Sequence, residues 1–204
     1  MNKLIIFLIA IGLIVFQQTS VGSFADQVDV GDPLRTGRAT YDAARDEYTV
    51  DGAGANIWAN RDEFHFVWRR LKGNFILSTN AGFTGKGVEP HRKIAWMVRS
   101  SLSDDSPHSS AVLHGDGLTS LQFRKTKAGA TEEIISKVKA ADVLQLERKG
   151  NTYKMSVARF GDVLTSDEVS LDLGDEVYIG VFVGSHNKDV VETGVFRDVK
   201  IQKQ

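Results

Sequence analysis

The sequence contains no cysteine, and this absence excludes disulfide cross-links, thiolate catalysis and a lipid anchor carried on cysteine. Proline is also scarce, with three residues that all stand in segments expected to be loops, namely Pro33, Pro90 and Pro107. Neither sign of charge dominates, because 25 Lys and Arg residues face 26 Asp and Glu residues. The chain therefore lacks the basic excess of a nucleic-acid-binding protein and any polybasic patch for a membrane surface.

Long apolar runs are absent except for Leu4–Phe16, at the start of the chain. This run is shorter than the about 20 residues that span a bilayer as a helix. It follows a basic start, and Ser23 and Ala25 occupy the −3 and −1 positions of a peptidase site before Asp26. We expect residues 1–25 to be a cleaved signal peptide, which predicts a secreted or periplasmic protein that is not inserted in the membrane. The alternative is an uncleaved anchor.

After the leader, apolar residues recur with a period of two, which is typical of β-strands. In the segment from Leu118 to Lys125, for example, Leu121 and Phe123 alternate with polar residues. Turn dipeptides separate such segments: Asp116-Gly117, Gly150-Asn151 and Gly161-Asp162. Roughly ten strands in one domain predict an all-β, antiparallel two-sheet sandwich or a barrel over residues 42–204. Residues 26–41 are polar and are expected to form a loose leader or an edge strand.

Strand parity predicts a core made of the following residues: Phe66, Trp96, Val98, Leu121, Phe123, Leu144, Leu146, Ile179, Val181 and Val183. Two local assignments stay open. Residues 64–69 present either Phe64, Phe66 and Trp68 to the core or the alternate set. The segment from Thr131 to Ala140 is compatible with a short helix or with a further strand.

The sequence shows none of the residue patterns that catalysis or metal binding requires. Acidic residues stand mainly at turns, and no Gly-x-Ser-x-Gly motif occurs. The histidines have no metal-ligand spacing, and His108 and His114 would lie about 20 Å apart along one strand. The Gly-rich segment 51–56 lacks the Gly-Lys-Ser/Thr of a phosphate loop. We therefore predict a domain that is not an enzyme and has neither a cofactor nor a catalytic metal site, while a structural calcium stays open.

Strand parity also places polar and aromatic side chains together on the sheet face opposite the core. The predicted ligand-binding set consists of Arg99, Gln122, Arg124, Tyr178, Phe182 and His186. Gly180 and Gly184 interrupt the aromatic positions and leave room for a ligand near the backbone. Guanidinium, amide and aromatic groups suit the hydroxyls and ring faces of sugars. The alternative is a solvated outer face on which the aromatic rings only cover neighbouring strands.

Several stretches resemble a family of concanavalin A-like jelly-roll domains: residues 51–58, 62–69, 93–99, 106–108, HGDGLTSLQFR from His114 to Arg124, 178–180, 185–186 and 196–199. Members stand alone or accompany glycoside hydrolases and TolB-like β-propellers, and this chain resembles the stand-alone form. The resemblance implies a sandwich of two curved antiparallel sheets, with carbohydrate binding as the expected function.

Three classes of function remain after these observations. The first is an exported, non-catalytic module that binds a glycan or similar polar polymer on the concave face. The second is a secreted hydrolase or lyase that acts on glycans through histidine and arginine of that face. The third is a structural module that contacts another protein of an envelope complex.

Overall fold

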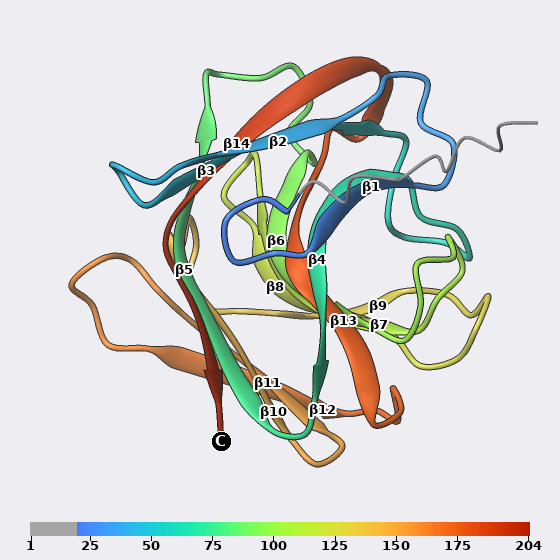
Figure 1. Ribbon diagram of the computed structural model, residues 1–204, viewed down its shortest axis with the longest axis vertical. Helices are drawn as coiled ribbons and strands as arrows, with labels where there is room; N and C mark the ends of the chain where they lie inside the picture. Colours follow the sequence, from blue (N-terminus) through green and yellow to red (C-terminus); the bar gives the residue numbers. More distant parts are fainter. Residues whose placement is uncertain (1–19) are drawn as a thin grey trace, which may run out of the picture.

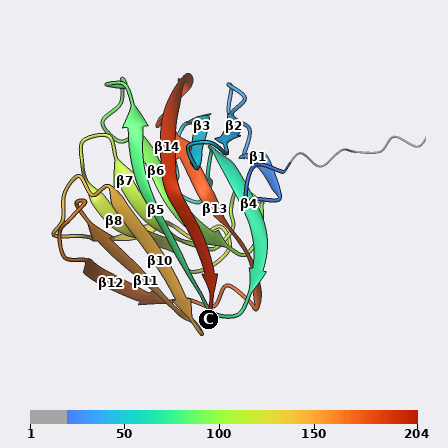
Figure 2. The same ribbon diagram turned by 60° about the vertical axis from the view of Figure 1, so that its left-hand side comes forward.

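The computed structural model describes residues 20–204, which form two seven-stranded antiparallel sheets packed face to face (Figure 1 and Figure 2). The predicted all-β jelly-roll sandwich is confirmed. Within residues 20–204, no helix is long and apolar enough to cross a membrane. Most of the predicted signal peptide lies outside the described residues.

Each sheet combines strands that are far apart in the sequence. The first sheet has the order β1 (Asp26–Val30), β4 (Phe64–Lys72), β13 (Glu176–Gly184), β6 (Lys93–Arg99), β7 (His108–His114), β8 (Thr119–Arg124) and β9 (Glu132–Ile135). The second has the order β12 (Thr165–Ser170), β11 (Thr152–Ala158), β10 (Val143–Lys149), β5 (Phe75–Thr84), β14 (Asn187–Lys203), β3 (Glu47–Gly54) and β2 (Arg38–Asp42).

The predicted turns and edges agree with this topology. Gly150-Asn151 joins β10 to β11 as a two-residue hairpin, and Asp116-Gly117 lies in the connection from β7 to β8. Residues 26–41 contain the whole of β1 and most of β2, which are edge strands of opposite sheets. The segment from Thr131 to Ala140, for which a helix and a strand both stayed open, contains strand β9, and no helix forms there.

The main core lies between the sheets, and Trp96 is its largest fully buried side chain. It is joined there by Val98, Leu121 and Ile179 from the first sheet and by Leu144 from the second. Their alternate neighbours Met97, Gln122 and Phe182 point to the outer face of the first sheet, as the pattern of two predicts. All the predicted core residues are buried, but Phe66 lies outside this main core.

Phe66 belongs to a second apolar cluster on the outer face of the first sheet, together with Phe64, Met97 and Phe182. The open orientation of β4 is thereby settled: Val67 faces the main core, and the phenylalanines face outward. His65, which stands between the two phenylalanines on β4, is also buried, and its Nδ1 lies 2.8 Å from a carboxylate oxygen of Asp29.

The short segment before β1 is part of the packed domain. Val21 and Phe24 are buried in the main core, and the Phe24 ring lies 5.3 Å from the Tyr48 ring and 6.1 Å from that of Trp96. The backbone N–H of Ser23 donates to the Tyr48 hydroxyl at 2.7 Å. A chain that began at Asp26 would lack these contacts.

Replacing Phe24 with alanine is expected to lower the free energy of unfolding by about 3 kcal/mol, because it empties a buried aromatic site. Chemical denaturation of residues 20–204 measures this change. The control is Leu34→Ala, since Leu34 is exposed and its truncation should leave stability unchanged. If Phe24→Ala unfolds at the same denaturant concentration as the parent, the segment is not part of the core.

Candidate functional site

Two of the predicted ligand-binding residues, Arg99 and Arg124, are fully buried beneath loops. Both point to the outer face of the first sheet, as parity predicts, but neither is accessible to a ligand there. Their guanidinium groups converge on the carboxylate of Asp62, which is also fully buried. The two arginines therefore act inside the structure, and parity alone does not reveal the loops that cover them.

Arg124 holds Asp62 with two hydrogen bonds, from Nη1 to Oδ2 at 2.8 Å and from Nη2 to Oδ1 at 2.7 Å. The same side chain donates to the backbone carbonyls of Ala59, Ser106 and Gly129, which lie in three different loops. Such bidentate, charge-assisted pairing suits the planar guanidinium. Arg124 therefore fastens three loops to the end of one strand.

Arg99 completes this group, which we call the Asp62 clamp (Asp62, Arg99 and Arg124). Its Nη2 donates to Asp62 Oδ2 at 3.3 Å and to the Ser103 carbonyl at 2.6 Å. Burial lowers the pKa of Arg99 to about 10, so its guanidinium stays protonated at neutral pH. Burial and the charges of Arg124 and Arg99 lower the pKa of the neighbouring His108, which is therefore neutral.

The clamp fixes the loop between β3 and β4, which carries Asn56 and Trp58. The backbone N–H of Glu63 donates to the Asn56 carbonyl at 2.9 Å, and that of Thr131 donates to the Trp58 carbonyl at 2.8 Å. These bonds lie directly beside Asp62 and Arg124. The position of Trp58 above the sheet therefore depends on the buried ion pairs.

The predicted aromatic platform does not face a ligand site. Phe182 is fully buried with its ring 4.9 Å from that of Phe64. Tyr178 is half-buried, 5.0 Å from the Trp68 ring. The space beside Gly180 is filled, because a Cβ there would collide with the backbone carbonyl of Val67 and would lie 2.8 Å from the ring of Phe66. This glycine accommodates the close approach of the neighbouring strand β4 rather than a ligand.

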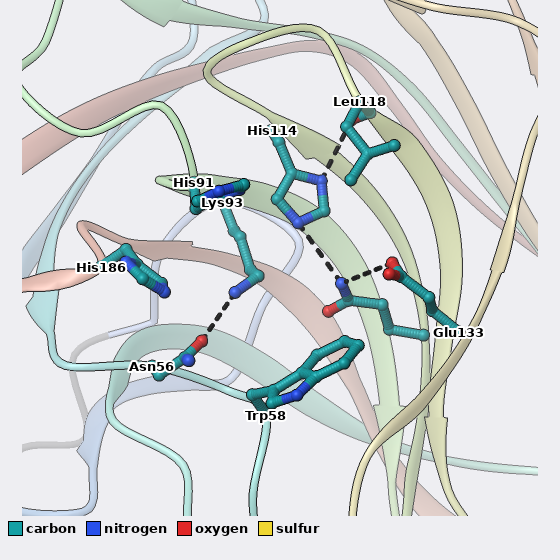
Figure 3. A pocket seen from close by; sticks show the side chains of 9 residues that line it. Asn56, Trp58, His91, Lys93, His114, Leu118, Glu133 and His186 are labelled. Carbon is teal, nitrogen blue, oxygen red and sulfur yellow. Dashed lines mark hydrogen bonds between the residues drawn. The ribbon is translucent and has the colours of Figure 1, made fainter.

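An open pocket of about 250 Å³ lies on the same sheet face, beside Lys93 at the start of β6 (Figure 3). Two predicted ligand-binding residues, Gln122 and His186, line it. The other lining residues are Asn56, Trp58, His91, Lys93, His114, Leu118 and Glu133. Among residues 20–204, no group of histidine and acidic side chains has a geometry that could hold a metal ion.

Lys93 extends into the middle of the pocket, between the histidines and Asn56 (Figure 3). Its residue is only 4% exposed, and its Nζ donates to Asn56 Oδ1 at 2.8 Å. Burial lowers the pKa of Lys93 to about 8. The amine is therefore mostly protonated at neutral pH, but it loses its proton far more easily than an exposed lysine does.

His114 and Gln122 form a hydrogen-bonded wall of the pocket. Burial and the charge of Lys93 lower the pKa of His114 to about 4, so the ring is neutral. Its Nδ1 lies 3.1 Å from the Leu118 carbonyl and donates to it, which leaves Nε2 to accept from Gln122 Nε2 at 3.3 Å. Gln122 Nε2 also donates to Glu133 Oε2 at 3.4 Å. These bonds fix the orientation of the Gln122 amide.

Several pocket residues were missed by the sequence analysis. Lys93 and His114 are paired across β6 and β7 and point to the outer face with Met97. Counting the alternation of β6 back by one residue from Ile94 places Lys93 on this face, and the strand pairing then places His114 beside it. Asn56 and Trp58 give no such signal, because they lie in a loop whose position depends on distant arginines.

No protein-family model matches the chain, and no curated protein does. Solved structures do match. A functionally unknown protein from Saccharomyces cerevisiae is 13% identical, with a TM-score of 0.67 over 91% of this chain and 99% of that one. A carbohydrate-binding module from Bacillus subtilis is 14% identical, with a TM-score of 0.57 over 89% and 98%. Lectin II from Ulex europaeus is 9% identical, with a TM-score of 0.54 over 88% and 99%. These similarities show a shared jelly-roll fold.

Arg124→Ala is expected to lower the free energy of unfolding by about 3–5 kcal/mol, because Asp62 would keep a buried charge with only a weak partner. Lys125→Ala is the matched control, since Lys125 makes an exposed ion pair with Glu132 and should cost less than about 1 kcal/mol. Urea denaturation of both variants measures the difference. Equal stabilities would show that the clamp does not hold the loops.

Acidification is expected to destabilise the protein between pH 6.5 and pH 4. His114 is neutral in the folded chain down to about pH 4, whereas in the unfolded chain it binds a proton near its ordinary pKa of 6.5. The unfolded state therefore takes up more protons in this window, at a cost of up to about 3 kcal/mol by pH 4. Denaturation at several pH values should give a shallower dependence for His114→Asn. Parallel curves would contradict this assignment.

Proposed function

We propose, from the concanavalin A-like jelly-roll fold of this chain and the pocket on its outer sheet face, that the protein is a non-catalytic module that binds a glycan. The observation that carries this proposal is Trp58, whose residue is 42% exposed beside a set of oriented polar groups. An indole face packs against the apolar side of a pyranose ring, and amide and ammonium groups bond its hydroxyls.

The size and rigidity of the pocket support the same proposal. Its volume of about 250 Å³ is below the range of about 300–1,000 Å³ found for sites that enclose drug-sized ligands. It suits one sugar unit at the end or side of a chain rather than a long internal stretch. The hydrogen bonds of Gln122 orient its amide and the bond to the Trp58 carbonyl holds the backbone of that residue, which reduces the entropy lost on binding.

The structural neighbours point in the same direction, since one is named as a carbohydrate-binding module and another as a lectin. The apolar run Leu4–Phe16 supports export of the protein to a secreted or periplasmic location, where polysaccharides are exposed.

Two alternatives belong to other classes: a glycan hydrolase or lyase, and a structural partner of an envelope protein. Release of reducing ends or unsaturated sugars would favour the first, and co-purification with one protein without glycan affinity would favour the second.

Trp58→Ala is expected to weaken glycan binding by about 10-fold or more, through loss of the stacking surface, without changing the melting temperature. A glycan array identifies ligands for residues 20–204, and titration calorimetry then measures the affinity of each variant. Phe160→Ala is the matched control, because Phe160 is 77% exposed and does not line this pocket.

The outcome that contradicts the proposal is a ligand bound equally well by Trp58→Ala and the parent. Loss of binding in Phe160→Ala but not in Trp58→Ala would move the site to the loop between β11 and β12.

A further inference from the structure

The further inference rests on the proposed function and concerns the ammonium of Lys93. Among residues 20–204, the ion pairs within 4.0 Å do not include this lysine. Its one hydrogen bond goes to the neutral amide oxygen of Asn56. An ammonium has three N–H donors, so Lys93 keeps donors for a ligand in the pocket.

The carboxylates around Lys93 are engaged elsewhere. Asp62 is held by two arginines, and Glu133 accepts from Gln122. Glu63 accepts from the backbone N–H of Ala55 at 3.0 Å. On the rim, Glu89 lies 3.8 Å from His186. The other titratable groups that line the pocket are His91, His114 and His186. None of these groups supplies a counter-charge in contact with the Lys93 amine.

Burying an ammonium without a counter-charge in contact is unfavourable, because the one hydrogen bond to Asn56 and the more distant charges of Glu133 and Asp62 offset only part of the lost hydration. The lowered pKa of Lys93, about 8, reflects this cost. An anion bound in the pocket would remove this cost of burying the Lys93 ammonium. A carboxylate is a compact anionic substituent, so it suits the limited volume of the pocket. The anion would add a charge-assisted hydrogen bond to the contacts that a neutral sugar makes.

We propose that the pocket binds a carboxylate-bearing sugar, the uronic acid unit of an acidic polysaccharide, with its carboxylate paired to the ammonium of Lys93. Trp58 packs against the ring of this unit, and Asn56 and Gln122 lie beside its hydroxyls. The charge of Lys93 thereby selects acidic over neutral glycans of the same ring structure.

Titration calorimetry with matched pairs of oligosaccharides tests the proposal, namely galacturonate against galactose oligomers and glucuronate against glucose oligomers. At least one acidic oligomer should bind more tightly than its neutral partner by about 10- to 100-fold. Lys93→Gln should remove this preference, so that the acidic oligomer binds no more tightly than its neutral partner. Lys188→Gln is the matched control, because it removes an exposed positive charge outside the pocket and should keep the preference.

A second measurement does not depend on a variant that must fold. Because the carboxylate raises the pKa of Lys93, binding at pH 8 should take up a fraction of a proton, which titrations in buffers of different ionisation enthalpy detect. Affinity for the acidic oligomer should also fall as the pH rises above 8.

Each outcome separates this inference from the proposed function. If neutral glycans bind as tightly as acidic ones and lose affinity in Trp58→Ala, the module binds glycans but the role of Lys93 is overturned. Preference for sulfated over carboxylated sugars also overturns it. If no glycan binds, the proposed function itself fails.

Discussion

The buried ion pairs between Asp62 and two arginines are the interaction on which the candidate site depends. The arginines stand at the ends of strands β6 and β8, whose opposite faces are anchored in the core by Trp96 and Leu121. The sandwich therefore sets where the guanidinium groups lie, and these groups set where the loops lie. A buried carboxylate with two cationic partners and further backbone bonds is costly to break, because each group left alone would keep an unpaired charge.

The outer face of the first sheet consists of three regions with different roles. The Asp62 clamp fastens the loops at one end, and the apolar cluster around Phe64 and Phe182 fills the middle. The pocket with Lys93 lies at the other end, under the loop that the clamp holds. Only this third region combines open volume with polar groups that still have free donors. The residues that hold the loops are thus different from those proposed to contact a ligand, so the pocket keeps its shape without one.

The period-two pattern predicted the sandwich and the sidedness of most strands, because burial between two sheets imposes alternation on the sequence. It left β4 undecided, since Phe64 and Phe66 alternate with His65 and Val67 and both sets are buried. Parity places Arg124 on the outer face but says nothing about what covers it. Coverage depends on loops whose positions follow from contacts between distant residues, such as the bond from Arg124 to the Ala59 carbonyl. Trp58 was missed for the same reason.

The central claim is that ligand contacts the pocket under the clamped loop, and nuclear magnetic resonance of the tryptophan indoles tests it most directly. The chain has three tryptophans, of which Trp58 is exposed in the pocket while the indole nitrogens of Trp68 and Trp96 are buried. Titration of the isotope-labelled protein with a bound acidic oligosaccharide should shift the indole signal of Trp58 and leave the signals of the other two in place. Binding that calorimetry detects but that leaves the Trp58 signal unmoved would contradict the account.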